Sequence, residues 1–116
     1  MANKNNFITG ITDLLVLGIL YKNDSYVYEI TKTINSQSKG LLDISQNTIY
    51  TATYKLEEAN LISEYSKLVG KKRTRVYYHI EPEGEKYYKK ILSDYQNITL
   101  GVKNMLDSLS EQGGQS

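Results

Sequence analysis

The sequence lacks cysteine and tryptophan, and it contains one proline, one histidine and only two arginines. Without cysteine, the chain can form neither a disulfide framework nor a thiolate metal site. A single histidine, no glycine-rich phosphate loop and no paired-carboxylate motif leave little material for catalysis. We therefore expect a protein that is not an enzyme, with no catalytic residues, no bound metal and no cofactor.

Long hydrophobic runs are missing as well. The first apolar run, residues 11–20, carries Asp13 and is about half of the ~20 residues needed to span a bilayer. The segment before it, residues 1–6, is polar and offers neither a basic leader nor a small-residue cleavage site. We expect a cytoplasmic protein with no membrane partner. Its 116 residues fit one domain with a modest core.

Basic residues are concentrated in one stretch of the chain. Residues 66–80 hold five of the 14 lysines and arginines and none of the 13 acids, although the net charge is only +1. A locally basic tip on a near-neutral protein is typical of a phosphate-binding surface. On charge alone, a solvated hairpin loop explains the stretch equally well.

Apolar spacing predicts three helices in the first half of the chain, over residues 9–21, 26–36 and 46–59. Asp24 or Ser25 is expected to cap the second helix, and Ser45 the third. The outward face of the third helix is polar near its N-terminus, which suits the reading of base edges in a DNA major groove. The candidate DNA-facing residues of this helix are Asn47, Thr48, Thr51, Tyr54 and Lys55.

A β-hairpin should follow, over residues 61–68 and 74–80, because both runs are rich in β-branched and aromatic residues. Alternation places Val76, Tyr78 and Ile80 on the face toward the helices. The other face would present Arg75, Tyr77 and a surface residue, His79, outward. The candidate phosphate contacts are Lys71, Lys72, Arg73 and Arg75, with Tyr77 beside them.

A long helix is expected from Pro82 to about residue 110, with apolar residues at spacings of three and four. Some 28 residues at ~1.5 Å each form a rod of roughly 42 Å, too long for a domain whose radius of gyration is near 12 Å to cover. The distal apolar stripe therefore predicts a two-fold homodimer, with a helix folded back on its own domain as the alternative. The expected divisions are a DNA-binding domain at 1–80, a dimerisation helix at 81–112 and a flexible tail at 113–116.

Helix, helix, turn, helix and basic hairpin, in this order, is the layout of a winged helix-turn-helix. The expected fold class is mainly α with a small β-hairpin, followed by a long C-terminal dimerisation helix. The third helix would enter the major groove while the hairpin holds phosphates, and a dimer would read half-sites about 34 Å apart. We expect a transcriptional repressor that binds double-stranded DNA in a sequence-specific manner. The alternative is a winged-helix protein-interaction module without DNA binding.

Eleven tyrosines are an unusually high number for this length. Tyr50 and Tyr78 are expected to be half-buried core residues with tethered hydroxyl groups. Tyr54 and Tyr77 suit phosphate contact and core packing about equally. Tyr95 suits plain dimer packing better than ligand stacking.

The stretch from Thr12 to Gly84, about two-thirds of the chain, resembles the PadR family of transcriptional regulators. The matching segments are LLVLGIL at 14–20, SYVYEI at 25–30, NTIY at 47–50, YKLE at 54–57, LI at 61–62 and KRTRVYY at 72–78. Members of this family are dimeric repressors, so the resemblance implies a homodimer on operator DNA. Two departures are Glu81, where threonine is usual, and Ala59-Asn60, where the family favours glycine.

One C-terminal helix and the Tyr-Val-Tyr of residues 26–28 resemble the LmrR-like multidrug-sensing branch of that family. The resemblance implies a flat pore at the dimer centre, lined by the first and last helices, that takes up planar aromatic drugs. The ligand-binding residues would then be Ile11, Leu15, Leu92 and Tyr95. Tyr95 lies near the position of the branch's pore tryptophan, a residue type that this chain lacks.

Overall fold

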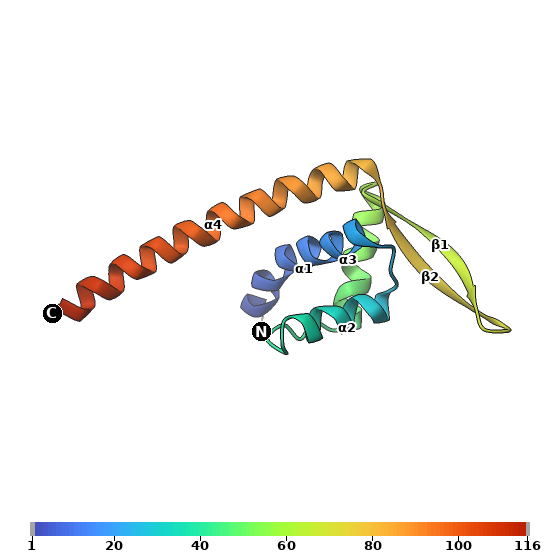
Figure 1. Cartoon of the computed structure of the whole chain (residues 1–116), viewed down its shortest axis with the longest axis horizontal. Coiled ribbons are helices and arrows are strands. Elements are labelled where there is room, and N and C mark those ends of the chain that lie inside the picture. The colour runs from blue at the N-terminus through green and yellow to red at the C-terminus, as the bar shows by residue number, and fades with distance from the viewer. Residues whose placement is uncertain (1, 116) are drawn as a thin grey trace.

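A computed structural model of the chain describes the backbone of residues 2–115 and the side chains of residues 10–111. Within this part of the chain, the elements are α1 (Ala2–Lys22), α2 (Val27–Gln37), α3 (Gln46–Glu58), β1 (Ile62–Val69), β2 (Arg73–Ile80) and α4 (Pro82–Gln115). Helices α1, α2 and α3 form the body, the hairpin projects on one side, and α4 extends away on the other (Figure 1). The order of elements confirms the winged helix-turn-helix fold, and we call the β1–β2 hairpin the wing.

The core lies where the three helices of the body meet the base of the wing. Helix α1 is central, because α2, α3, α4 and β2 all pack against it. In α2 and α3 the buried residues recur every three or four positions, as the apolar spacing predicts. The buried core residues are Val16, Leu17, Leu20, Val27, Ile30, Ile34, Ile44, Ile49, Ala52, Leu56, Ile62, Tyr78 and Ile80.

The wing is a two-stranded antiparallel sheet, paired from Ile62↔Ile80 to Val69↔Arg73. Only its base is buried on the helix-facing side, since Tyr78 is 6% exposed and Val76 is 43% exposed. The linker between α1 and α2 pairs with the wing from outside. The backbone N–H of Ser25 donates to Tyr78 at 3.3 Å, and the N–H of Tyr78 donates back at 2.7 Å.

The predicted cap of α3 is confirmed, because the N–H of Thr48 donates to Ser45 Oγ at 3.2 Å. The predicted cap of α2 is wrong. Its N-cap is Tyr26, which makes no side-chain capping bond. Ser25 instead donates its hydroxyl to Glu29 Oε1 at 2.6 Å, and the carboxylate of Asp24 accepts hydrogen bonds from the wing.

Two helices are longer than their apolar periodicity indicates. Helix α1 begins at Ala2 and not near residue 9, and α4 continues through Gln115 and not only to about residue 110. Backbone 113–115, expected to be a flexible tail, is thus part of α4, while Ser116 lies outside the described residues. Apolar spacing marks only helical turns that have a hydrophobic face to bury, so polar turns at either end escape it.

The first turn of α4 sits directly on the chain segment that enters the wing. The N–H of Glu81 donates to the Leu61 carbonyl oxygen at 2.9 Å. A Cβ atom at Gly84 would lie 2.0 Å from that same oxygen, so only glycine allows this approach. The turn before β1 is likewise closed by Asn60 at φ 62, a left-handed conformation that asparagine tolerates. Asparagine therefore replaces the glycine that the resembled family favours here.

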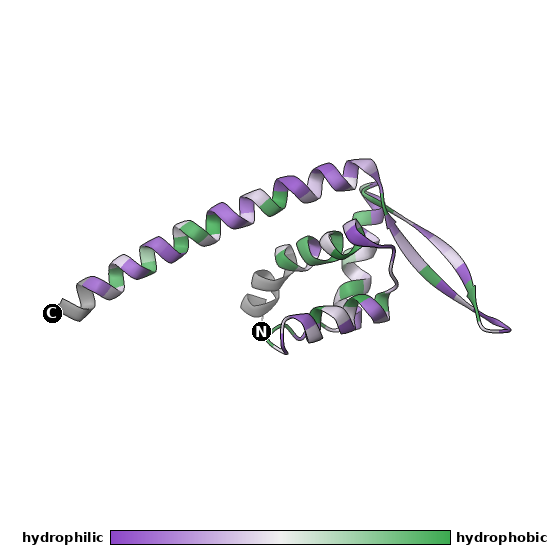
Figure 2. Ribbon diagram, in the orientation of Figure 1, coloured by the Kyte–Doolittle hydropathy of each residue, from purple (hydrophilic) through white to green (hydrophobic). Residues whose placement is uncertain are grey.

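Helix α4 leaves the body after its first few turns. The molecule measures 68 × 28 × 25 Å and has a radius of gyration of 17.3 Å, whereas about 13 Å is expected for a compact chain of this length. Hydrophobic residues nevertheless recur along the projecting part (Figure 2). Among the described residues, no helix is long and apolar enough to cross a membrane.

Candidate nucleic-acid interface

Helix α3 presents a polar face to solvent. Asn47, Thr51 and Tyr54 are exposed and Thr48 is half-buried, while Ile49, Ala52 and Leu56 on the other side are buried. The hydroxyl of Thr51 donates to the Asn47 carbonyl at 3.0 Å, and the hydroxyls of Ser45 and Thr48 lie 3.0 Å apart. The side-chain amide of Asn47 and the accepting lone pairs of the Thr51 hydroxyl remain available to a partner.

Lys55, expected to face DNA, is held by helix α1. Its Nζ lies 2.8 Å from Asp13 Oδ2, and the Asp13 side chain is only 13% exposed. The other carboxylate oxygen of Asp13 is buried and has no hydrogen-bond partner in the described part of the chain. The ion pair therefore ties α3 to α1, and Lys55 must leave it in order to contact a base.

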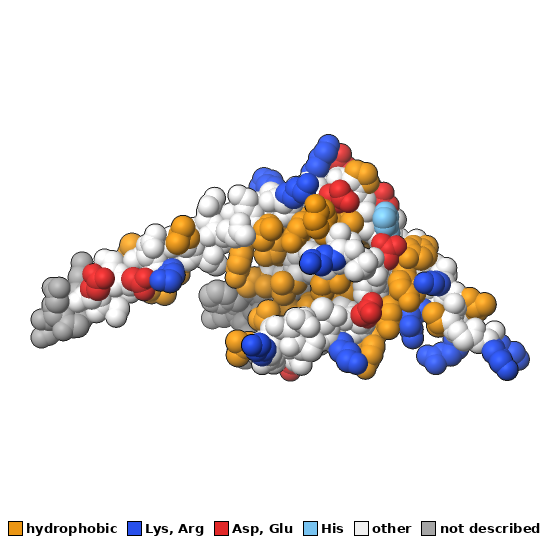
Figure 3. Space-filling model, in the orientation of Figure 1, with side chains coloured by type: hydrophobic (Ala, Val, Ile, Leu, Met, Phe, Trp, Pro, Cys, Tyr) orange, Lys and Arg blue, Asp and Glu red, His pale blue; other side chains and the backbone are white. Residues whose placement is uncertain are grey.

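The tip of the wing is basic and exposed. Lys71, Lys72 and Arg73 are all exposed, and Gly70 takes φ 75 in the turn before them. Lysine and arginine side chains gather at the far end of the hairpin, with no acidic side chain visible among them (Figure 3). This arrangement is the one that a phosphate-contacting wing requires.

Strand alternation predicted that Arg75 and Tyr77 point outward into solvent. In the structure, other side chains of the wing and the α1–α2 linker pack against both. The Arg75 guanidinium lies 4.1 Å from the centroid of the Tyr26 ring. The ring of Tyr77 stacks on Tyr65 at 5.7 Å and meets Tyr26 edge-on at 5.2 Å, with Lys67 Nζ 5.2 Å above it. Both residues are half-buried in a cluster of rings and cations on the outer face of the wing.

A groove of about 610 Å³ runs between α2, α3 and the wing. Sequence reasoning missed three residues that line it: Tyr28, Gln46 and Tyr50. Tyr50 was expected to be half-buried, but it is 54% exposed. Thr53 takes the buried position in its place, with its hydroxyl donating to the Tyr50 carbonyl at 2.9 Å. The four-residue spacing of Gln46 and Tyr50 places both on one helix face and was the available signal.

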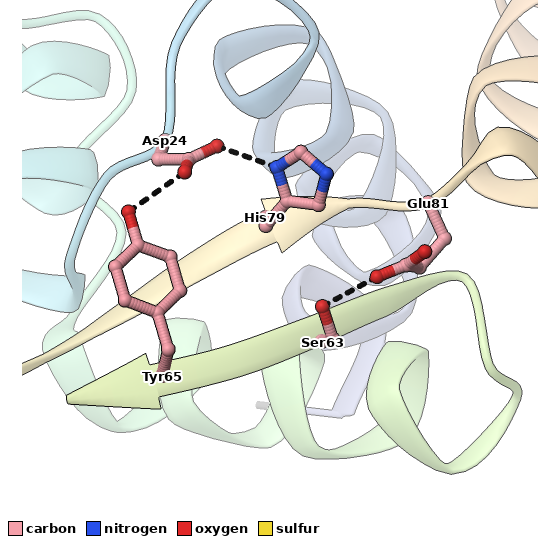
Figure 4. Close-up of polar contacts among 5 residues, drawn as sticks. All are labelled: Asp24, Ser63, Tyr65, His79 and Glu81. Carbon is pink, nitrogen blue, oxygen red and sulfur yellow. Dashed lines mark hydrogen bonds and ion pairs between the residues drawn. The ribbon is translucent and has the colours of Figure 1, made fainter.

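Asp24 connects the α1–α2 linker to both strands of the wing (Figure 4). Its Oδ2 accepts from the Tyr65 hydroxyl at 2.7 Å, and its Oδ1 accepts from His79 Nδ1 at 2.8 Å. Farther along the same face, the Ser63 hydroxyl donates to Glu81 Oε2 at 2.5 Å and so joins β1 to the start of α4. His79 is exposed, as predicted, but it also forms an ion pair with Asp24.

These contacts shift the pKa values of the two ionisable partners in opposite directions. Burial raises the pKa of Asp24, but the hydrogen bonds from Tyr65 and His79 outweigh it and leave the pKa lowered. The hydrogen bond to Asp24 raises the pKa of His79 above its ordinary 6.5, and the negative charges of Glu81 and Glu85 add to this rise. The ion pair thus favours a charged histidine.

The stability of the protein should accordingly depend on pH through His79. A group whose pKa is raised by folding stabilises the fold below its ordinary pKa, and the contribution is lost as pH rises through the shifted value. Between about pH 6 and about pH 8, the melting temperature should therefore fall more for the wild type than for His79→Gln. Parallel melting curves for the two proteins across this range would show that the pair has no such effect.

A second concave surface lies between α1 and α4, with the C-terminal end of α2 along one side. A groove of about 480 Å³ is lined by Leu15, Leu92 and Tyr95 from the predicted ligand set. Ile11, the fourth member, lines a neighbouring depression of about 330 Å³ that Tyr95 also borders. The structure therefore brings three of these residues together and places the fourth beside them.

Beyond this groove, α4 carries an uncovered apolar stripe. Its members are Tyr95, Ile98, Val102, Met105, Leu106 and Leu109, which are 43–64% exposed. They recur at spacings of three and four residues and so share one side of the helix. We call this set the α4 stripe.

Comparison with known proteins gives a consistent result. Residues 16–90, from the middle of α1 to the first turns of α4, match the model of the transcriptional regulator PadR-like family. A transcriptional regulator from Clostridium thermocellum is 33% identical, with a TM-score of 0.79 over 85% of this chain and 96% of that one. A PadR family transcription regulator from Clostridium difficile is 27% identical, with a TM-score of 0.71 over 82% of this chain and 97% of that one.

More distant structures share the fold. PadR of Bacillus subtilis, solved in complex with operator DNA, is 21% identical, with a TM-score of 0.66 over 71% of this chain and 46% of that one. The family match covers most of the chain, and a structure above 30% identity matches it at nearly full length. The chain therefore belongs to the transcriptional regulator PadR-like family.

Proposed function

We propose that the protein is a homodimeric repressor that binds operator DNA with α3 in the major groove and the wing on the flanking phosphates. The observation that carries this proposal is the acid-free basic wing tip, whose Arg73 lines the same groove as Gln46 and Tyr50 of α3. The similar fold of Bacillus subtilis PadR was solved with operator DNA bound. A protein-interaction module would need no such cluster of lysine and arginine side chains next to a helix that can enter a major groove.

The two surfaces have different roles in this proposal. Lys71, Lys72, Arg73 and Arg75 neutralise phosphates and supply most of the affinity. Asn47, Thr48 and Thr51 read base edges, with Lys55 joining them only if it leaves Asp13. Tyr54 and Tyr77 approach the backbone, the second from within the ring cluster of the wing.

The exposed α4 stripe supports the proposed dimerisation. Helix α4 has 34 residues, which at ~1.5 Å each make a rod of about 51 Å, and the side chains of residues 93–111 are all exposed in the single chain. Pairing of two such rods about a two-fold axis would bury the stripe and present two α3 helices to successive major grooves, about 34 Å apart.

The division of labour between wing and α3 is testable with two single variants. Duplexes are first selected from a random pool, and binding of the winners and of random DNA is followed by fluorescence anisotropy. Arg73→Ala should weaken binding to every duplex alike and make the salt slope less steep by about 2 for a dimer. Asn47→Ala should relax preference at particular base positions by about 5- to 100-fold and leave random DNA unaffected.

Equal effects of both variants on random DNA would remove this assignment of roles. Absence of duplex binding by the wild type at low salt, together with capture of a defined protein partner, would favour the interaction-module alternative. If Asn47→Ala prefers the selected duplexes over random DNA as strongly as the wild type does, Asn47 does not read a base.

We also propose that a planar aromatic ligand in the groove between α1 and α4 releases the DNA, as in the resembled LmrR-like branch. The groove has the size of a small-molecule site, and the half-exposed ring of Tyr95 offers a stacking surface. A planar dye such as proflavine, titrated without DNA, should bind the wild type about tenfold more tightly than Tyr95→Ala. Tyr54→Ala, on the exposed face of α3, is the matched control. Identical dye affinity for all three proteins would rule out this site.

A further inference from the structure

Three consecutive residues of the α1–α2 linker all contact the wing. Asp24 accepts hydrogen bonds from Tyr65 on β1 and His79 on β2 (Figure 4). Ser25 exchanges two backbone hydrogen bonds with Tyr78 of β2. Tyr26 packs its ring against the Arg75 guanidinium and the ring of Tyr77. The linker therefore follows β2 from its base toward its tip, and each of its three residues makes two contacts with the wing.

The wing needs an external support of this kind. A two-stranded hairpin alone is marginally stable in water, and most of this one lies outside the core. Among its 16 strand residues, only Ile62, Tyr78 and Ile80 at the base are fully buried. Core packing thus fixes where the wing is attached, but not the angle at which the distal half projects. The basic tip lies at the end of that distal half.

The linker contacts supply this missing constraint. Tyr65 is paired across the sheet with Tyr77, and His79 with Ser63, so Asp24 grips the two strands at staggered positions. A carboxylate held on both strands opposes rotation of the ribbon about its own axis. The two hydrogen bonds to the Asp24 carboxylate belong to a strong class, because bonds to an ionised group are among the stronger ones in proteins. Tyr26 adds a further contact at Arg75, nearer the tip.

We propose that the linker Asp24–Ser25–Tyr26 sets the angle between wing and α3, and that Asp24 is a positioning residue for DNA binding. The inference rests on the proposed function, because the angle matters only if tip and α3 contact the same duplex. Asp24 touches the wing and not the DNA. It acts by holding Lys71, Lys72 and Arg73 close to the phosphates that flank the major groove occupied by α3.

The same linker starts at the end of α1. The N–H of Asn23 donates to the Ile19 carbonyl at 3.1 Å and closes the helix one residue before Asp24. Ile19 and Lys22 line the groove between α1 and α4. A displacement of this end of α1 would therefore be passed to the wing through the linker.

The test uses Asp24→Ala, with Ser63→Ala as the matched control. Ser63 also makes a short hydrogen bond on the same face of the wing, but to Glu81 at the start of α4 and not to the linker. Asp24→Ala should lower affinity for a selected duplex about tenfold and make the salt slope less steep, because a mobile tip loses phosphate contacts. Ser63→Ala should bind as the wild type does. Asp24→Asn keeps an acceptor for Tyr65 and should restore part of the affinity.

A distance measurement separates positioning from general destabilisation. Because the chain has no cysteine, spin labels can be placed at Lys71→Cys on the wing tip and Ser36→Cys on α2. Labelled protein diluted into unlabelled protein should give one narrow distance distribution for the wild type and Ser63→Ala, and a broad one for Asp24→Ala. Should Asp24→Ala fail to fold, Tyr65→Phe removes one of the two hydrogen bonds and should give an intermediate width.

An unchanged distance distribution and unchanged affinity in Asp24→Ala would overturn the inference. Failure of the wild type itself to bind duplex DNA would instead count against the proposed function, and the spin-label distances would still decide whether the linker holds the wing. A broad distribution in the wild type would also overturn the inference, since the wing would then have no set angle to maintain.

Discussion

Replacement of Val102 and Leu106 by aspartate should convert the proposed dimer to a monomer. Both residues belong to the α4 stripe and are 51% and 59% exposed in the single chain. Charges placed at the centre of the proposed apolar interface would have to be desolvated without a partner, which opposes association. Sedimentation or light scattering measures the change in mass directly. Operator affinity should fall by about 100-fold or more, because two linked half-sites become two independent ones.

The matched control for this experiment is Leu100→Asp. Leu100 is 58% exposed on the same helix, but it lies about 200° around the helix axis from Ile98 and therefore away from the stripe. This variant should remain dimeric and bind DNA normally. Dimers in the double variant, or a monomeric wild type, would show that α4 does not pair through the stripe.

Among the described glycines, Gly84 is expected to show the largest loss of stability on replacement by alanine. The new Cβ would lie 2.0 Å from the Leu61 carbonyl oxygen, a backbone atom that cannot move without displacing β1 or α4. The free energy of unfolding should fall by about 3 kcal/mol, measured by chemical denaturation. At Gly10 in α1 an added Cβ meets nothing within 4 Å, so Gly10→Ala should be neutral or slightly stabilising. Equal stability of the two variants would mean that α4 does not rest on the Leu61 carbonyl.

Periodicity accounts for what the sequence predicts correctly. Buried residues at spacings of three and four mark α2 and α3, and alternating β-branched and aromatic residues mark the wing. Ser45 could be identified as a cap because capping is a contact over three residues. The α4 stripe is also readable, since it depends on one helix alone. Each of these features is local in the chain.

Contacts distant in the chain account for what the sequence does not predict. Asp24 has the composition of a helix cap, but its partners Tyr65 and His79 lie 41 and 55 residues away. Lys55 has the position of a base-reading residue, but Asp13 on another helix holds it. In each case a charged side chain finds a partner through the tertiary fold, and such a partner leaves no periodic signal. The predicted solvent exposure of Arg75 and Tyr77 is reduced for the same reason, because Tyr26 packs against Arg75 and Tyr65 stacks on Tyr77.

The dependence of duplex affinity on salt tests the central claim most directly, namely that the basic wing and α3 together form a DNA-binding surface. If the four basic side chains proposed for phosphate contact act in each subunit of the proposed dimer, a plot of log binding constant against log salt concentration should have a slope of about −7. The slope should become markedly less steep when Lys71, Lys72 and Arg73 are replaced together by alanine. A wild-type slope near zero, or one that the triple replacement leaves unchanged, would contradict the account.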